Sequence, residues 1–387
     1  MNFNKKIIES PIVFLLGAGS SAPLGMPTTI GFREVAKRRA SPSYRSKIQD
    51  LYEMAAVRYL IGTEQVSVED LLEFIHELRL ALWIMWRSGI KPSVSETLSA
   101  LDLNDWQNAS VSINKIRYQI IKIIHRVYGD CSVRKVSSLW SPLLTEVSQY
   151  TKVLPIFTMN YDWTFEKLAI GSPAKYKVVD GYSSVTGGSW DDRHFSQFRP
   201  SSNKVNIALF KLHGSTCWLR TGVKSLGTFT ESEEMRGDIR DNYQSPFEII
   251  YPGHRREVEL GDEHWWMEGL GSNISGGQIE TPPYSLMYEY LRASLSKAKA
   301  LIVIGYAFGD PEVNNIVGKA MESNSQLHLI DVDPGRGIFS NPPYEFKLDH
   351  YSNASIDDRE RYVWTKAKFG TAKTKTRIIE KIEDLLE

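Results

Sequence analysis

A glycine-rich turn directly after an apolar run is the first part of the sequence that can do chemistry. Residues 12–16 read IVFLL, which has the length and composition of a buried parallel strand. Residues 17–22 follow with the pattern G-x-G-x-x-A, in which backbone N–H groups can approach a phosphate. A plain tight loop after a core strand is the alternative interpretation, because short glycine patterns often arise by chance.

Two further apolar runs end in side chains suited to acid–base chemistry. Residues 153–160 end in Asn160, with Asp162 shortly after it, and residues 205–214 deliver His213 to the end of the run. Histidine titrates near neutral pH and is a natural general base, and an asparagine amide can both donate and accept hydrogen bonds. Each residue also has a structural alternative. Asn160 can cap a helix that starts with the next residue, and His213 can be part of a turn.

The last two junctions between an apolar run and a loop lie at residues 300–310 and 326–334. The first contains Gly305 and ends in Asp310, which is as well suited to cap a helix starting at the following proline as to bind a ligand. Asn314 is a candidate only because it lies nearby. The second junction carries Asp331 and Asp333 at its end.

Buried apolar runs alternate with helical patterns, which predicts an α/β fold with a Rossmann-like parallel sheet flanked by helices. The carboxyl ends of its strands share one edge, where open α/β sheets bind ligands. Strand patterns disappear between about residues 45 and 150, so we expect a helical insertion, with Ser67 and Asp70 forming a capping box. We expect one catalytic domain over 1–335 and a C-terminal extension over 336–387 that ends in an amphipathic helix.

Other stretches of the sequence have weaker patterns. Residues 171–203 are rich in Gly, Ser and Asp and predict a surface loop or hairpin, and residues 246–253 predict a strand. Metal-ligand residue types occur at His254, Glu263 and His264, but their spacing matches no standard zinc site, so we interpret them as loop residues.

The basic segment 364–377 contains Trp364 and Phe369 and could contact nucleic acid. A solvated basic loop before the last helix is favoured, because 46 basic and 46 acidic residues give the chain a formal net charge of zero. Bulk charge therefore gives no argument for nucleic acid or an anionic membrane as the main partner.

Cysteine content and apolar run length limit the class of protein further. The 387 residues contain two cysteines, Cys131 and Cys217, which excludes a disulfide scaffold or an all-cysteine zinc site and fits a reducing compartment. The run at 12–16 is shorter than a secretory signal needs, and the run at 80–86 is far too short to cross a bilayer. We expect a cytoplasmic protein.

Taken in order, four motifs resemble the sirtuin family. Residues 17–21 read G-A-G-S-S, Gly25-Met26-Pro27 leads to Phe32-Arg33, residues 158–162 read T-M-N-Y-D, and His213 precedes a glycine. The resemblance covers roughly residues 12–335. The stretches TMNYDWTFE and LIVIGYAFGDPEVNN are similar to the bacterial sirtuin-like branch found in antiphage defence proteins, many of which hydrolyse NAD+.

The resemblance implies an NAD+ site at the carboxyl edge of the sheet. Asn160 and His213 are the expected catalytic residues, and Asp162 is expected to contact the nicotinamide carboxamide. Asp331 can accept hydrogen bonds from the adenosine ribose. The full set of expected NAD+-binding residues is Gly17, Ala18, Gly19, Ser20, Ser21, Pro27, Phe32, Arg33, Asp162, Gly305 and Asp331.

Departures from the family pattern argue against a protein deacylase. Deacylating sirtuins usually carry a four-cysteine zinc module, which two cysteines cannot build, so no zinc is expected. They have an Asp directly after the G-[IV]-P segment, where this chain has Thr28, and a V-V-F-G-E run that appears here as IIYPG at 249–253. We therefore predict an NAD+ glycohydrolase that yields ADP-ribose and nicotinamide, acting as an NAD-depleting effector of bacterial antiphage defence.

Two other functions stay open: an NAD-dependent protein deacylase or ADP-ribosyltransferase, and a non-enzymatic subunit that senses NAD+ or ADP-ribose. An unregulated NADase would kill its host, so we expect a homo-oligomer or a partner to switch the activity. A HerA-type hexameric ATPase is one partner known for this branch. Direct binding of nucleic acid and association with a membrane are not expected.

Overall fold

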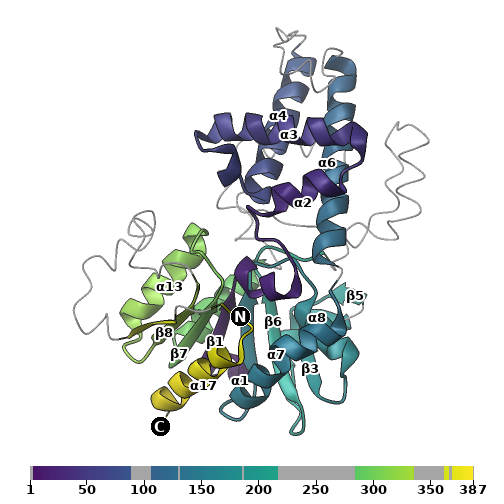
Figure 1. Cartoon of the computed structure of the whole chain (residues 1–387). Coiled ribbons are helices and arrows are strands. Elements are labelled where there is room, and N and C mark those ends of the chain that lie inside the picture. Colours follow the sequence, from purple (N-terminus) through teal and green to yellow (C-terminus); the bar gives the residue numbers. More distant parts are fainter. Residues whose placement is uncertain are drawn as a thin grey trace. The chain divides into compact units, whose positions relative to one another are not determined.

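The computed structural model describes residues 3–88, 106–129, 131–184, 187–216, 284–334, 361–365 and 368–386. The chain divides into two compact units (Figure 1). The α/β unit comprises Met1–Met26, Cys131–Ser215 and Ile279–Glu387, and the helical unit comprises Pro27–Asp130 and Thr216–Gln278. The predicted strand at 246–253 and the residues Cys217, His254, Glu263 and His264 lie outside the described residues.

The α/β unit is built on a seven-stranded parallel sheet in the order β3-β6-β2-β1-β7-β8-β9. Its strands are β1 (Ile12–Leu16), β2 (Leu154–Thr158), β3 (Tyr176–Val179), β6 (Val205–Lys211), β7 (Ala300–Ile304), β8 (His328–Val332) and β9 (Tyr362–Thr365). A separate antiparallel hairpin joins β4 (Tyr182–Ser184) to β5 (Gly187–Trp190). The prediction of a Rossmann-like α/β fold is confirmed.

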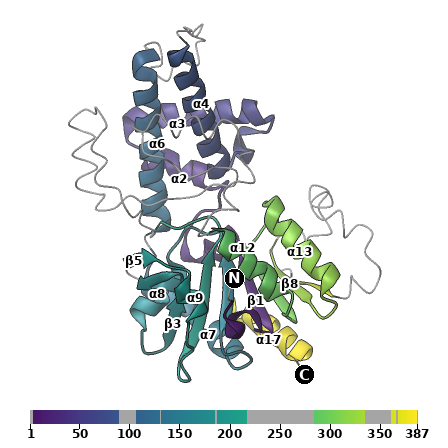
Figure 2. The ribbon, with the colours of Figure 1, turned by 180° about the vertical axis from the view of Figure 1, so that it is seen from behind.

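Helices cover both faces of the sheet (Figures 1 and 2). One face carries α7 (Val133–Val147), α8 (Thr164–Gly171) and α17 (Ala372–Leu386). The other carries α1 (Lys5–Ile8), α9 (Arg193–Ser196), α12 (Tyr284–Leu295) and α13 (Pro311–Ser323). Right-handed crossovers require this arrangement, because the chain moves outward from β1 in one direction through α7 and α8, and in the other through α12 and α13.

The core of this unit lies between the sheet and its helices. All residues of β1, β2, β6 and β7 are buried, as expected for parallel strands that are covered on both faces. Phe210 of β6 stacks between Phe157 and Phe195, with ring centroids 4.6 Å from each. On the α7 face, the ring of Trp140 lies 4.7 Å from that of Phe369.

Two segments differ from the predictions. Residues 171–203 contain the edge strand β3 and the short helix α9 in addition to the expected hairpin. In the segment 364–377, Trp364 lies in β9 and α17 begins at Ala372, so the described part of the segment is not one continuous loop. Phe369 is buried in the core, where it cannot stack on a nucleic-acid base.

The helical unit contains α2 (Phe32–Arg39), α3 (Pro42–Tyr59), α4 (Val68–Arg87) and α6 (Trp106–Tyr128). The predicted capping box is present at the start of α4. Asp70 N–H donates to Ser67 Oγ over 3.0 Å, and Ser67 N–H donates to Asp70 Oδ2 over 2.8 Å. Across the described ranges, no helix combines the length and apolarity needed to cross a membrane.

The glycine turn after β1 packs directly on the turn after β7. Gly19 N–H donates to the Gly305 carbonyl over 2.9 Å, and Gly17 N–H donates to the Ile304 carbonyl over 3.0 Å. A Cβ built on Gly305 would lie 2.4 Å from Ser20 N, and Gly305 also has a positive φ of 60°. Glycine is therefore required here by the close approach of two backbones as well as by conformation.

Substitution of Gly305 tests this packing. We expect Gly305→Ala to lower the free energy of unfolding by about 2–4 kcal/mol, because the methyl group overlaps backbone atoms that cannot rotate away and alanine disfavours positive φ. Urea unfolding measures the change. Gly309→Ala is the matched control, since a Cβ at Gly309 meets no atom within 4 Å. Equal stabilities for the two variants would contradict the prediction.

Candidate functional site

The loops that follow β6, β2, β1 and β7 share one edge of the sheet, because these four strands are parallel neighbours in that order. They carry most of the residues that the sequence singles out in the α/β unit. His213 follows β6, Asn160 and Asp162 follow β2, the glycine turn follows β1, and Gly305 follows β7. The structure therefore brings together side chains that are far apart in sequence.

Asn160 links the loop after β2 to the glycine turn after β1. Its Nδ2 donates to the Gly17 carbonyl and lies within hydrogen-bond distance of the Ser20 and Ser21 hydroxyls, each at 3.0 Å. The carbonyl partner fixes the orientation of the amide, because only its nitrogen can donate. The side-chain oxygen of Asn160 is thereby left as the group that can accept a hydrogen bond from a ligand or water.

Asp162 belongs to the same hydrogen-bond network through Ser21. Its Oδ2 accepts a hydrogen bond of 2.5 Å from Ser21 Oγ, and its Oδ1 accepts one of 2.9 Å from the N–H of Thr164, the first residue of α8. Asp162 therefore anchors the start of α8, and the interpretation of Asn160 as a helix cap is wrong. The carboxylate of Asp162 is buried, with 4% of the residue exposed.

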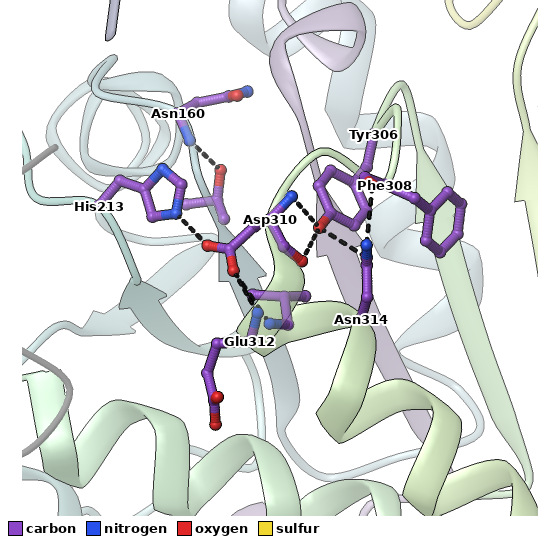
Figure 3. Close-up of polar contacts among 9 residues, drawn as sticks. Asn160, His213, Tyr306, Phe308, Asp310, Glu312 and Asn314 are labelled. Atoms are coloured by element: carbon purple, nitrogen blue, oxygen red, sulfur yellow. Dashed lines mark hydrogen bonds and ion pairs between the residues drawn. The ribbon is translucent and has the colours of Figure 1, made fainter. Parts of the chain in front are cut away.

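His213 pairs with Asp310, which lies between β7 and α13 (Figure 3). His213 Nε2 is 2.7 Å from Asp310 Oδ2, and both side chains are about one-tenth exposed or less. Asp310 Oδ1 also accepts from the N–H groups of Glu312 and Val313, so it does cap α13. Burial acts to raise the pKa of Asp310, but His213 and these N–H groups outweigh it and bring the pKa below its usual value.

The loop that presents Asp310 is held by buried polar side chains. Tyr306 Oη accepts from the Asp310 N–H over 3.1 Å and donates to Asn314 Oδ1 over 3.0 Å. Asn314 Nδ2 in turn donates to the carbonyl of Phe308, whose φ of 51° is unusual for a residue with a side chain. Asn314 therefore supports the loop conformation (Figure 3). The sequence marked this residue by proximity alone.

Asp331 lies in β8, beyond the four loops described above. Its Oδ2 accepts from Tyr362 Oη of β9 over 2.9 Å, and Oδ1 is buried without a hydrogen-bond partner in the described part of the chain. Burial raises the pKa of Asp331 to about 7, with a smaller contribution from the charge of Asp333. An unpaired buried acceptor at a strand end fits a ligand hydroxyl as a donor.

Three of the expected NAD+-binding residues belong to the helical unit. Phe32 is buried and stacks on Tyr128, with ring centroids 6.1 Å apart. The guanidinium of Arg33 lies over the ring of Tyr52, 5.9 Å from its centroid, and donates to a glutamine of α3. Pro27 accepts a hydrogen bond from Tyr128 Oη through its carbonyl.

The N–H groups of the glycine turn already have partners within the α/β unit. Ser20 N–H donates to Gly17 O over 2.9 Å, Ser21 N–H donates to Ala18 O over 3.2 Å, and Gly19 N–H donates to Gly305 O. The turn is a pair of short 3₁₀ helices and not the start of a long α-helix. Its backbone therefore offers an anion fewer uncommitted donors than the G-x-G-x-x-A pattern predicts.

A cluster of buried charges lies next to the site, on β6 and α8. Lys211, two residues before His213, forms a 3.1 Å ion pair with Glu166, and its Nζ also donates to the Asp162 carbonyl. Asp180, which follows β3, is 4% exposed. Burial and the charge of Glu166 raise the pKa of Asp180 to about 7, and Lys211 opposes this increase. The sequence alone did not mark these three residues, because their importance comes from burial.

The raised pKa of Asp180 predicts a dependence of stability on pH. Between about pH 4 and pH 7 the folded state keeps a proton that the unfolded chain loses, so the free energy of unfolding falls as the pH rises. Asp180→Asn should remove this fall and be more stable than the wild type at pH 8, on the order of 2–4 kcal/mol. The amide oxygen can still accept the 3.1 Å hydrogen bond from Tyr182 N–H.

Urea unfolding at pH 4.5 and pH 8 measures the difference. The two proteins should have similar stabilities at the lower pH and diverge at the higher one. Parallel stability curves would contradict the raised pKa.

Comparison with known protein families gives one match. Residues 155–337 match the family model of the SIR2-like domain. The matched range contains Asn160, Asp162, His213, Asp310 and Asp331, and it starts after the glycine turn. A search of curated proteins found no match. Over the matched residues the chain is therefore similar to SIR2-like domains, in agreement with the sirtuin-like motifs of the sequence.

No metal centre accompanies this site in the part of the chain that the structure describes. Among these residues, no group of three or more His, Cys, Asp or Glu side chains is placed to hold a metal ion. Cys131 is buried, and burial is the main cause that raises the pKa of its thiol to about 11, so it remains a neutral thiol.

Proposed function

We propose that the chain hydrolyses the nicotinamide–ribose bond of NAD+ to give ADP-ribose, nicotinamide and a proton. The observation that supports this most strongly is the position of Asn160 and the His213–Asp310 pair around one glycine turn, on the edge where parallel sheets bind ligands. The match to the SIR2-like domain supports NAD+ as the substrate.

Cleavage of this bond develops oxocarbenium character on the ribose, as in other glycosidic cleavages. In the proposed reaction, His213 removes a proton from a water that attacks the ribose carbon, and nicotinamide leaves with the bonding electron pair. The proton then passes from His213 to solvent. Asn160 Oδ1 orients the water or a ribose hydroxyl, since Nδ2 is held by the glycine turn.

The remaining predicted residues bind the substrate in this proposal. The glycine turn and Gly305 lie against the pyrophosphate, and Asp331 accepts from the adenosine ribose. Asp162 contacts the nicotinamide carboxamide through lone pairs that Ser21 and Thr164 do not use. Pro27, Phe32 and Arg33 belong to the same set of proposed NAD+-binding residues.

At the level of the cell, we propose that this activity depletes NAD+ in bacterial antiphage defence. The basis is the resemblance of the T-M-N-Y-D and G-Y-A-F-G-D segments to that branch of sirtuin-like proteins. The activity is then low until a homo-oligomer or a HerA-type ATPase switches it on. Light scattering of the purified protein, alone and with the ATPase, tests this part.

Nicotinamide release from NAD+ tests the proposed reaction. We expect Asn160→Ala and His213→Ala each to reduce the rate by roughly 10²-fold or more, because each removes a group that acts on the reacting atoms. Asn203→Ala and His328→Ala are matched controls, since Asn203 lies two residues before β6 begins and His328 is the first residue of β8, so both lie at the amino edge of the sheet. Intact NAD+ under every activating condition, or full activity in both site variants, would contradict the proposal.

The same assay separates the two other functions. Turnover that requires an acylated peptide or a modified target would indicate a deacylase or an ADP-ribosyltransferase. Binding of NAD+ or ADP-ribose without turnover would indicate a sensing subunit.

A further inference from the structure

We propose that Asp310 is a positioning residue that holds His213 with its proton on Nε2, so that Nδ1 is the basic nitrogen of the site. This inference rests on the proposed function for its catalytic consequence, but its structural content can be tested without NAD+. It gives Asp310 a second role beyond capping α13.

Backbone N–H groups, Tyr288 and His213 surround the carboxylate of Asp310, and Tyr306 holds its backbone. Its Oδ1 accepts from the N–H groups of Glu312 (2.9 Å) and Val313 (3.1 Å) at the start of α13, and its backbone N–H donates to Tyr306 Oη. Oδ2 is then the oxygen that faces His213 Nε2 at 2.7 Å. Because the carboxylate cannot rotate without breaking the cap, it also fixes the orientation of the imidazole ring (Figure 3).

The charge state of Asp310 decides which ring nitrogen carries the proton. The N–H groups of Glu312 and Val313 and the hydroxyl of Tyr288 donate to this carboxylate and favour its ionised form, and the positive end of the α13 dipole does the same. An ionised carboxylate can only accept, so Nε2 must donate to it. In the neutral imidazole the free lone pair is then on Nδ1, which lies on the part of the ring that is turned away from Asp310 in Figure 3.

The groups next to the His213–Asp310 pair are either neutral or already paired with an opposite charge. Tyr288 of α12 is buried, and burial, the charges of Asp310 and Glu312 and a hydrogen bond to the Asp310 side chain raise its pKa well above the usual value, so it stays a neutral hydroxyl that donates to this carboxylate. Glu312 is paired with Arg292 at 2.6 Å. His213 therefore has Asp310 as its charged hydrogen-bond partner within the described residues.

Asp310→Asn separates the two roles of the residue. Asparagine caps helices about as well as aspartate, so α13 should keep its start and the variant should fold. With the amide oxygen facing the α13 N–H groups, the NH₂ group faces Nε2, which must then accept. The proton moves to Nδ1 and the basic nitrogen is lost. Asp310→Ser also retains a capping oxygen but removes the partner of Nε2 altogether.

Nitrogen-15 NMR of the histidine ring is the primary measurement, on the full chain without ligand, with the His213 signals assigned by comparison with His213→Gln. We expect the Nε2–H tautomer in the wild type and the Nδ1–H tautomer in Asp310→Asn. Glu312→Gln is the control: Glu312 lies in the first turn of α13, two residues after Asp310, and its substitution should leave the wild-type tautomer unchanged. A wild-type tautomer in Asp310→Asn would overturn the inference.

Kinetics of nicotinamide release provide the second measurement. We expect kcat to fall roughly 10²- to 10⁴-fold in Asp310→Asn, with KM within about threefold of the wild type, since substrate contacts are unchanged. Asp310→Ser should retain more activity than Asp310→Asn, because nothing then forces the wrong tautomer. Equal kcat in wild type and Asp310→Asn would overturn the positioning role. A wild type that shows the expected tautomer but releases no nicotinamide would instead contradict the proposed function.

Discussion

The candidate site depends on hydrogen bonds that tie together the loops following β2, β1 and β7. Asn160 Nδ2 donates to the carbonyl of Gly17, and Gly19 N–H donates to the carbonyl of Gly305. These groups lie beyond the ends of the sheet ladder, so they have no strand partner and must be satisfied by each other. The contacts need glycine, because a Cβ on Gly17 or Gly305 would overlap the facing backbone. The result is a fixed distance between the glycine turn and the polar residues that follow the neighbouring strands.

Three buried carboxylates near this edge have pKa values that are shifted in different directions because their polar and charged neighbours differ. Asp310 accepts two backbone N–H groups and His213, and its pKa lies below the usual value. Burial raises the pKa of Asp180, which also lies near the charge of Glu166, and of Asp331, which accepts from the hydroxyl of Tyr362, to about 7 in each case. At Asp310 the hydrogen-bond donors and the imidazole outweigh burial, whereas at Asp180 and Asp331 burial dominates. The carboxylate with the lowered pKa is the partner of the histidine.

The buried Lys211–Glu166 ion pair also helps to position the loops of the site. A buried ion pair is weak evidence for stability, since desolvation of both charges offsets their attraction. It does constrain structure: Lys211 reaches from β6 to both the carboxylate of Glu166 on α8 and the carbonyl of Asp162. Strand β6, which leads to His213, is thereby connected to the loop that carries Asn160.

Much of the fold could be predicted from the sequence, and the strands that were not predicted have a common physical cause. The runs that became β1, β2, β6, β7 and β8 are almost wholly apolar, because a central parallel strand is covered on both faces. The strands β3 and β9 are the two edges of the sheet. Strands of four residues are too short for an apolar pattern to be distinguished from a loop or a helix segment, and these two form because β6 and β8 offer unpaired backbone groups. Pairing across the sheet, and not local sequence, determines these two strands.

The sequence by itself determined which residue types stand at the ends of the strands, and therefore that the glycine turn, Asn160 and His213 share one edge. That conclusion needs only the rule that parallel strands end together. Only the tertiary structure decided which partner each side chain has. Asp310 lies 97 residues from His213 and follows a strand separated from β6 by two others. No spacing or pattern encodes their 2.7 Å contact, because it depends on how two loops fold over the end of the sheet.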